Sequence, residues 1–280
     1  EAMVPKAIPQ SIIVVGSGAI GIEFASFYRA FGAEVTVVEV LDRILPVEDE
    51  EISKEAARAF KKRGIRLITG AKIEKTEKGS GGAKMSVTVN GKSETLEAEV
   101  VISAVGVVVN EWLETGVRGV YAIGDLVGPP WLAHKASHEG VLAAEKIAGV
   151  KDLHPLDTTR IPGCTYSTPQ IASVGLTEAK AKERGHEIKV GRFPFRANGK
   201  AIALGETTGF VKTVFDAKTG ELLGAHMIGA EVTELIQGYG VAMTLETTEA
   251  DLIRAVFPHP TLSEMMGEAV LDAYGRVLHT

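Results

Sequence analysis

The order of apolar and polar positions predicts alternating strands and helices at the start of the chain. Four apolar residues, Ile12 to Val15, predict a buried strand. After Gly32, the β-branched run from Val35 to Val38 has no polar alternation, as expected of a second buried strand that is parallel to the first. Between the two strands, apolar residues recur at steps of four, three and four, the spacing of one helix face: Ile20, Phe24, Phe27 and Phe31.

Three glycines separate the first strand from the helix in the spacing G-x-G-x-x-G. Gly16 lets the chain turn sharply, Gly18 lets the backbone approach a pyrophosphate, and Gly21 lets the helix pack closely on the sheet. Glu39 ends the second strand, where it can accept hydrogen bonds from the hydroxyls of an adenosine ribose and would repel a 2′-phosphate. The stretch predicts a Rossmann-type site for NAD rather than NADP; the alternative is an ordinary glycine-rich turn.

Further apolar runs extend this part of the chain into an α/β domain. Asn90-Gly91 stands between two alternating runs and is the strongest short signal for a hairpin. The predicted elements are a helix, a third parallel strand, the two hairpin strands and a last buried strand: Glu50–Arg63, Ile65–Ile68, Lys84–Val89, Ser93–Glu97 and Glu99–Ala104. We expect residues 1–117 to form the nucleotide-binding domain, with the hairpin as an antiparallel insert.

The pattern changes twice after this domain. Within residues 118–153, a strand over Val120–Gly124 leads into Asp125, and a helix follows over Leu132–Ala148. One strand and one helix cannot bury a core of their own, so we expect this segment to complete another structure. Residues 154–280 predict an α+β domain with four antiparallel strands and four helices: Gln170–Gly175, Glu187–Phe195, Phe210–Asp216, Leu222–Ile228, Thr177–Arg184, Val232–Glu246, Glu249–Ala255 and Ser263–Tyr274.

Composition and charge narrow the function classes. The 280 residues carry a net charge of −6, which argues against a nucleic-acid partner because phosphate binding needs clustered positive charge. The longest apolar run, Val100 to Val109, is too short to span a bilayer, and no secretory leader is visible. Cys164 is the one cysteine, so an internal disulfide is excluded and a reducing compartment such as the cytoplasm is expected.

His259 is the strongest candidate for acid–base chemistry. Pro258 and Pro260 restrict the backbone on both sides of it, and Glu264 lies five residues further on. A carboxylate on one ring nitrogen sets the tautomer and raises the basicity of the imidazole. The alternative is structural, because Thr261-x-x-Glu264 is also a capping box that needs no catalytic role.

Other polar residues carry weaker signals. His134 and His138 have the i, i+4 spacing of a metal pair, but no further ligands accompany them, so we expect no metal. Asp125, at the end of the predicted strand, can bind a ribose or ribitol hydroxyl or can cap a turn. Cys164 has no cationic neighbour in sequence and favours a packing role over a nucleophilic one.

Taken together, these motifs resemble the pyridine nucleotide-disulfide oxidoreductase family over nearly the whole chain. The resemblance rests on the segments VVGSGAIGIEFASFY, VISAVG, GVYAIGD, LAHKASHEG, ASVGLTE and HPTLSE. It implies a homodimeric flavoenzyme that oxidises dihydrolipoamide through a disulfide and FAD and passes a hydride to NAD⁺. It also implies a partner, the lipoyl-bearing acyltransferase component of a 2-oxoacid dehydrogenase complex, in the cytoplasm or the mitochondrial matrix.

The resemblance assigns a role to each candidate residue. His259 is implied to take the dithiol proton and Glu264 to orient it, both acting on the partner subunit's disulfide. Around NAD it implies contacts from Gly16, Gly18, Gly21, Glu23 (near the nicotinamide), Glu39 and Gly106. Around FAD it implies contacts from Asp125, Leu132, Ala133 and His134. The residues 118–153 then read as the remnant of an FAD domain, and residues 154–280 as a dimerisation domain.

The chain also departs from the family pattern. It has neither the FAD-binding G-x-G-x-x-G unit nor the C-x-x-x-x-C disulfide, and a stretch is missing between Val117 and Arg118. Either a longer polypeptide exists, or a truncated form cannot hold FAD tightly or reduce lipoamide. The alternative function is a catalytically silent NAD-binding and dimerisation fragment. An NADH oxidase is disfavoured by HPTLSE, and a mercuric reductase by the lack of a C-terminal cysteine pair.

Overall fold

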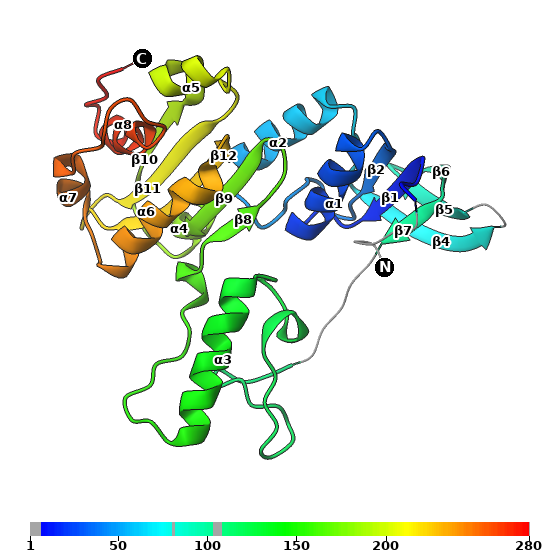
Figure 1. Ribbon diagram of the computed structural model, residues 1–280, viewed down its shortest axis with the longest axis horizontal. Helices are drawn as coiled ribbons and strands as arrows, with labels where there is room; N and C mark the ends of the chain where they lie inside the picture. Colours follow the sequence, from blue (N-terminus) through cyan, green and yellow to red (C-terminus); the bar gives the residue numbers. More distant parts are fainter. Residues whose placement is uncertain (1–6, 80–81, 103–107, 280) are drawn as a thin grey trace. The chain divides into compact units, whose positions relative to one another are not determined.

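The computed structural model describes residues 7–79, 82–102 and 108–279 (Figure 1). These residues divide into two compact units, one within residues 1–103 and 164–280 and one within residues 104–163. The first unit contains two lobes. We call its described residues up to 102 the Rossmann lobe and its residues from 164 onward the interface lobe, and we call the second unit the middle unit.

The Rossmann lobe is built on a parallel sheet of order β3-β2-β1-β7, as the apolar runs predict. Ile12 of β1 lies between Val35 of β2 and Val100 of β7 in the register. Ile12 and Val35 are buried together with Phe60. The bounds of the strands and helices are β1 Ser11–Val15, α1 Ala19–Ala30, β2 Glu34–Val38, α2 Glu50–Lys62, β3 Arg66–Ile68 and β7 Val100–Ile102.

The buried face of α1 differs from its apolar stripe. The side chains that pack into the core are Ile22, Ala25 and Tyr28, whereas Phe27 and Phe31 are 44% and 59% exposed. Because Ile22, Ala25 and Tyr28 face the core, the rings of Phe27 and Phe31 lie on the flank of the helix. There Phe27 and Phe31 contact each other, with ring centroids 4.8 Å apart. The spacing predicted the helix correctly but did not predict which side is buried.

The antiparallel insert has three strands instead of the predicted two, in the order β4-β5-β6. The additional strand, β4 Ala71–Gly79, pairs with β5 Gly82–Val89, which pairs with β6 Lys92–Ala98. Most side chains of β4 are charged and exposed, so no apolar alternation marks it in the sequence. Met85 of β5 lies opposite Leu96 of β6, and both are buried. The hairpin prediction is confirmed, but it was incomplete.

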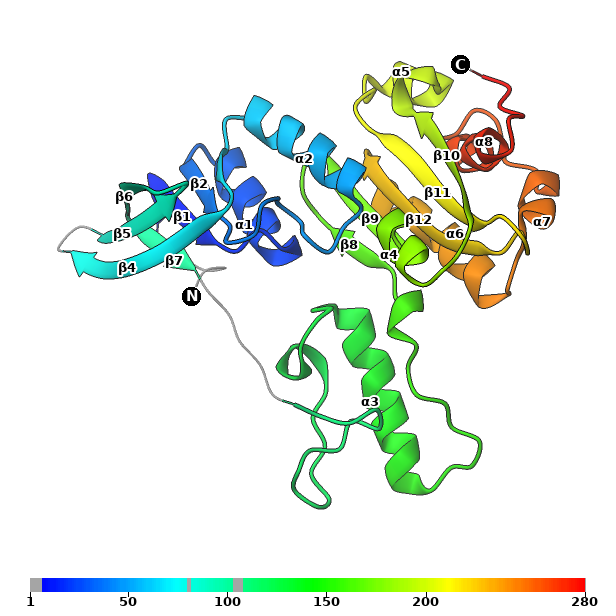
Figure 2. The same ribbon diagram turned by 180° about the vertical axis from the view of Figure 1, so that it is seen from behind.

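The interface lobe is a five-stranded antiparallel sheet of order β10-β11-β12-β9-β8. Helices α6 and α8 pack in one apolar core with this sheet, around buried residues such as Phe215, Tyr239 and Met265 (Figures 1 and 2). Only the short elements β8, η3 and α5 were not predicted. The bounds are β8 Gly163–Thr165, β9 Gln170–Gly175, α4 Glu178–Glu183, β10 Ile188–Pro194, η3 Phe195–Ala197, α5 Gly199–Leu204, β11 Phe210–Asp216, β12 Leu222–Gly229, α6 Val232–Thr244, α7 Glu249–Arg254 and α8 Glu264–Ala273.

The middle unit consists of α3 Ala133–Ala148 and two 3-10 turns, η1 Gly124–Val127 and η2 Thr158–Arg160. The prediction of a strand over Val120–Gly124 is wrong. Tyr121 makes a single antiparallel bridge with Glu114, and no strand lies beside it among the described residues. A strand needs a neighbour for its N–H and C=O groups, and without one Val120 to Ile123 form no regular element beyond the bridge at Tyr121. The apolar core of the unit is small.

No helix in the part of the chain that the structure describes is long and apolar enough to cross a membrane.

Replacing Phe60 tests the core of the Rossmann lobe. Phe60 is fully buried on α2, so Phe60→Ala leaves a cavity and should reduce the free energy of unfolding by about 3–5 kcal/mol. Phe31→Ala is the matched control, since that ring is 59% exposed and its loss should cost less than about 1 kcal/mol. Urea denaturation followed by circular dichroism measures both. Equal losses would contradict the assignment of the core.

Candidate functional site

The glycine-rich loop between β1 and α1 has the geometry of a phosphate-binding turn. Gly16 has φ +94°, and its N–H donates to the carbonyl of Val38 at 2.9 Å, so the loop folds back over the end of β2. A Cβ on Gly21 would lie 2.0 Å from the carbonyl oxygen of Gly16, which is impossible without movement. A Cβ on Gly18 would meet nothing within 4 Å, so this position opens to space that a ligand can use.

Glu39 lies at the end of β2 and binds the loop directly. Its Oε2 accepts hydrogen bonds from Ser17 N at 2.8 Å and Ser17 Oγ at 2.7 Å, and its Oε1 accepts one from Leu41 N at 2.9 Å. Burial acts to raise the pKa of Glu39, but these hydrogen bonds outweigh it and hold the pKa below its usual value. The carboxylate is therefore charged and only 5% exposed.

Glu23 lies in the second turn of α1 and contacts the interface lobe. Its Oε1 accepts a hydrogen bond from Tyr166 N at 2.9 Å, at the segment that links β8 to β9. Nothing in the sequence pattern indicated this contact. Gly106, which the resemblance places at the dinucleotide, lies outside the described residues.

His259 and Glu264 form the pair that their spacing predicted. His259 Nδ1 lies 2.8 Å from Glu264 Oε1, and the imidazole is 78% exposed beside the start of α8. Glu264 Oε2 accepts a hydrogen bond from Thr261 N at 2.9 Å. One carboxylate thus contacts both His259 and Thr261, but the predicted capping box does not form, because the N-cap of α8 is Ser263 and its side chain makes no cap hydrogen bond. The Thr261 bond, together with the His259 bond, keeps the pKa of Glu264 below its usual value despite some desolvation.

Asp125 is exposed in η1, and a buried ion pair supports the turn that carries it. Glu139 Oε2 accepts a hydrogen bond from Gly124 N at 2.7 Å, and Glu139 Oε1 pairs with Lys135 Nζ at 2.8 Å. Lys135 Nζ also donates to Gly128 O at 3.2 Å. Lys135 and Glu139 were not among the predicted site residues, although their i, i+4 spacing with opposite charges is a visible signal for a helical ion pair.

The residues at the start of α3 follow the same turn. Leu132 is the N-cap of α3, and Ala133 is its first residue. His134 Nε2 donates to Pro162 O at 2.8 Å, and His138 Nδ1 donates to His134 O at 2.8 Å. Both histidines thus bind backbone carbonyls. The described residues contain no group of three or more side chains that suits a metal ion.

Cys164 is half-buried in β8. Its thiol lies 3.9 Å from the carbonyl of Thr233, and burial raises its pKa. A raised pKa favours the thiol over the thiolate, which is the nucleophilic form. This environment suits packing rather than nucleophilic chemistry.

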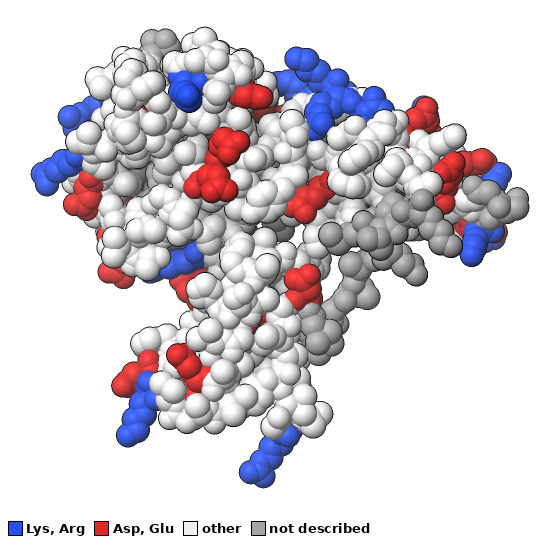
Figure 3. Space-filling model, in the orientation of Figure 1, with Lys and Arg blue, Asp and Glu red and all other residues white. Residues whose placement is uncertain are grey.

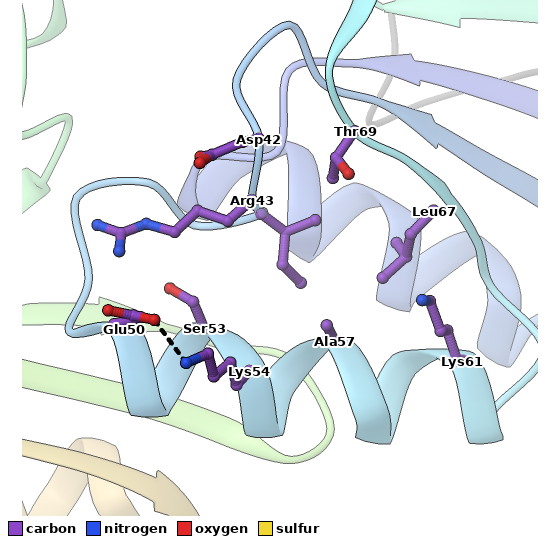
Figure 4. A pocket seen from close by; sticks show the side chains of 10 residues that line it. Asp42, Arg43, Glu50, Ser53, Lys54, Ala57, Lys61, Leu67 and Thr69 are labelled. Carbon is purple, nitrogen blue, oxygen red and sulfur yellow. Dashed lines mark ion pairs between the residues drawn. The ribbon is translucent and has the colours of Figure 1, made fainter. Parts of the chain in front are cut away.

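A pocket of about 470 Å³ lies between helix α2 and the loop that follows Glu39 (Figure 4). None of the site residues that the sequence predicts lines it. Its walls come from that loop, from α2 and from the end of β3: Asp42, Arg43, Ile44, Glu50, Ser53, Lys54, Ala57, Lys61, Leu67 and Thr69. Basic side chains gather over α2 in Figure 3. Within α2, Lys54 is exposed but pairs with Glu50, and Arg58 is exposed but pairs with Glu55. Such paired surface charges do not by themselves define a ligand.

Sequence comparison assigns the chain to a family. The family model of pyridine nucleotide-disulphide oxidoreductases matches residues 1–111, and the model of their dimerisation domain matches residues 161–270. The glycine loop falls in the first match and the His259–Glu264 pair in the second. The chain belongs to the pyridine nucleotide-disulphide oxidoreductase family, as its motifs predicted.

Within this family the chain is similar to dihydrolipoyl dehydrogenases. It is 59% identical to that of Rhizobium etli, 55% to that of Zymomonas mobilis and 46% to that of Bacillus subtilis, in each case over the whole chain. It spans only 63%, 65% and 64% of the length of these relatives. The alignment with the Rhizobium protein covers 301 residues against 280 in the chain, so that relative has residues inside the matched region that this chain lacks.

Solved structures share the fold. LpdA from Mycobacterium tuberculosis matches with a TM-score of 0.82 at 26% identity, over 95% of this chain and 62% of LpdA. The HOCl-induced flavoprotein disulfide reductase RclA from Escherichia coli matches with a TM-score of 0.81 at 25% identity, over 95% of this chain and 65% of RclA. These matches confirm the predicted fold class, with an α/β nucleotide-binding part and an α+β dimerisation part.

The lowered pKa of Glu39 predicts a pH-dependent contribution to stability. A carboxylate with a lower pKa in the folded state stabilises above its unfolded pKa, here 4.5, and this contribution is lost as the pH falls through the folded pKa. Glu39→Gln should therefore be less stable than the wild type at pH 7, and the difference should shrink below pH 4.5. Urea denaturation at a series of pH values measures it. Glu34→Gln, exposed at the other end of β2, is the control. A constant difference between pH 7 and acid would contradict the prediction.

Proposed function

We propose that the chain is the NAD-binding and dimerisation part of a dihydrolipoamide dehydrogenase. One observation carries the proposal: an exposed imidazole, His259, is held by the Glu264 carboxylate in the same chain as an intact dinucleotide loop. An acid–base pair and a dinucleotide site together fit a reaction that removes protons from a dithiol and delivers a hydride. The names of the dihydrolipoyl dehydrogenase relatives support the same reaction.

The Rossmann lobe is proposed to bind NAD. Gly16 and Gly21 shape the turn and Gly18 leaves room for the pyrophosphate, so the cradle fits the group. Glu39 Oε1, which accepts a hydrogen bond from Leu41 N, is proposed to accept one from a ribose hydroxyl as well. We also propose that Glu23 lies near the nicotinamide and that Gly106 contacts the dinucleotide.

The middle unit is proposed to contribute to an FAD site. Asp125 is exposed on a turn that the buried Lys135–Glu139 pair makes rigid, and this fits a carboxylate that binds the ribitol side of the flavin. Leu132, Ala133 and His134 would lie beside the ring system. FAD, when bound, carries two electrons between the disulfide and NAD⁺.

The interface lobe is proposed to supply acid–base chemistry. With Nδ1 held by Glu264, His259 can accept a dithiol proton at Nε2, for which the described residues offer no hydrogen-bond partner. Proton acceptance would make the imidazole cationic, and the neighbouring Glu264 carboxylate stabilises that charge. The net reaction oxidises the two thiols of dihydrolipoamide to a disulfide and reduces NAD⁺ to NADH with release of one proton.

We further propose how the protein assembles. The matching dimerisation-domain model supports a homodimer. Within it, His259 and Glu264 are proposed to act on the partner subunit's disulfide. The lipoyl-bearing acyltransferase component of a 2-oxoacid dehydrogenase complex would supply the substrate. We propose boundaries at 117/118 and 153/154 between the NAD-binding domain, the FAD-domain remnant and the dimerisation domain. The single cysteine supports a reducing compartment, the cytoplasm or the mitochondrial matrix.

Dinucleotide preference tests the role of the Rossmann lobe. The wild-type chain should bind NADH at least about tenfold more tightly than NADPH, because a buried carboxylate at Glu39 repels a 2′-phosphate. Glu39→Gln should lose most of this preference, and Glu34→Gln should keep it. Titration followed by NADH fluorescence measures each affinity. Equal affinities of the wild type for both dinucleotides would contradict the NAD assignment.

Replacement of His259 tests the acid–base role in the flavin-containing enzyme. His259→Gln should lower lipoamide-dependent turnover by about 10²–10⁴-fold, the usual contribution of a general acid–base group. Glu264→Gln should have a smaller effect and should shift the pH profile of turnover. His279→Gln is a matched control, because His279 Nδ1 likewise pairs with a carboxylate of α8, Glu268 Oε1, at 2.7 Å. Full turnover of His259→Gln would exclude the proposed role.

A second candidate function is a catalytically silent NAD-binding and dimerisation fragment. The observation that favours it is the single cysteine, because these 280 residues cannot form a redox disulfide by themselves. Intact mass and a visible absorption spectrum distinguish the two. A mass well above 29.7 kDa with flavin colour supports the enzyme, and a mass of 29.7 kDa without colour supports the fragment.

A further inference from the structure

The two lobes of the first unit meet at a buried cation. Lys212 of β11, in the interface lobe, is 1% exposed, yet it carries an ammonium group. Its Nζ contacts Asp49 Oδ1 at 2.9 Å, Glu178 Oε2 at 3.0 Å and Glu51 Oε1 at 3.2 Å. Asp49 and Glu51 belong to the Rossmann lobe, so the interface lobe inserts a cation into the start of its helix α2.

The side chain of Lys212 is protonated although it is buried. Burial acts to lower the pKa of Lys212, but the bonds to Asp49 and Glu178 outweigh it and the pKa is raised. Arg192 of β10 binds Glu51 as well, with both Nε and Nη2. Two cations of one lobe thus hold the carboxylates at the start of α2.

Asp49 connects this cluster to the loop that follows Glu39. Asp49 Oδ1 also accepts Glu51 N at 3.0 Å, which makes Asp49 the N-cap of α2. In the first turn of α2, Ser53 Oγ donates to Leu45 O at 3.1 Å (Figure 4 shows Ser53 beside this loop). The position of Asp49 therefore sets the position of Leu45.

Leu45 in turn holds the glycine-rich loop. Leu45 N donates to Ser17 O at 2.9 Å, and Ser17 is the residue between Gly16 and Gly18. Ser17 is fully buried, and its own N and Oγ bind Glu39. A continuous path of hydrogen bonds and helix backbone thus runs from Lys212 to the loop.

We propose that Lys212, although it lies in the interface lobe, is a positioning residue for the dinucleotide loop of the Rossmann lobe. It acts through Asp49 and the Leu45–Ser17 hydrogen bond. The proposal rests on the proposed NAD-binding function of that loop. It explains why a fully buried lysine contacts two carboxylates of the other lobe and one of its own, where an apolar side chain would pack without desolvating a charge.

The test uses Lys212→Met in the full chain, with Lys218→Met as control. Lys218 is exposed, lies in the same lobe and pairs with Glu187 at 3.1 Å. Lys212→Met should raise the Kd for NADH roughly two- to thirty-fold, and Lys218→Met should not change it. Amide hydrogen exchange should become faster at Ser17 and Leu45. The β5–β6 hairpin of the same lobe should keep its exchange rates, which a general loss of stability would not allow.

A second variant covers a failure of Lys212→Met to fold. Asp49→Asn keeps a good N-cap residue but removes the charge that Lys212 binds, and it should speed exchange at Leu45 in the same way. Unchanged exchange at Ser17 and Leu45 in the folded variants overturns the proposal, whatever happens to NADH binding. A wild-type chain that does not bind NADH contradicts the proposed function instead, and the exchange rates still decide the role of Lys212.

Discussion

The first unit depends on a buried ammonium group that must be matched by carboxylates. Lys212 contacts Asp49 and Glu51 of the Rossmann lobe, so these ion pairs join the two lobes. Apolar packing also joins the two lobes, because Ile171 and Ile228 of the interface-lobe sheet pack among the buried residues of the Rossmann lobe. Two lobes that are far apart in sequence therefore behave as one compact unit, and the start of α2 is fixed from both sides.

The contact between the two lobes also explains how residues of the interface lobe support the glycine-rich loop of the Rossmann lobe. The hydrogen bonds of Glu39 to Ser17 hold the loop in place, and the loop after Glu39 returns to Ser17 through Leu45. A loop that is already rigid loses little conformational entropy when a ligand binds, so these hydrogen bonds favour binding. The same design recurs in the middle unit, where the buried Lys135–Glu139 pair supports the exposed Asp125.

In the His259–Glu264 pair, one carboxylate serves two contacts, although the predicted capping box itself does not form because the N-cap of α8 is Ser263. A carboxylate has two oxygens, and Glu264 uses one for Thr261 N and the other for His259. The structural contact fixes the rotamer of Glu264, and a fixed carboxylate orients the imidazole better than a mobile one. The hydrogen bond from Thr261 N to Glu264 is therefore part of the arrangement that a general acid–base histidine requires.

Features that depend on local order could be predicted from the residues alone: the glycine loop, the parallel strands around it, the hairpin at Asn90-Gly91 and the five-residue spacing of His259 and Glu264. Turns and periodicity are set by neighbours along the chain. The folded chain was needed to establish the buried face of α1, the polar strand β4 and the absence of a strand at Val120–Gly124. It was also needed to establish which carboxylates surround Lys212. Burial and strand pairing depend on residues far away in sequence, and no local pattern encodes those partners.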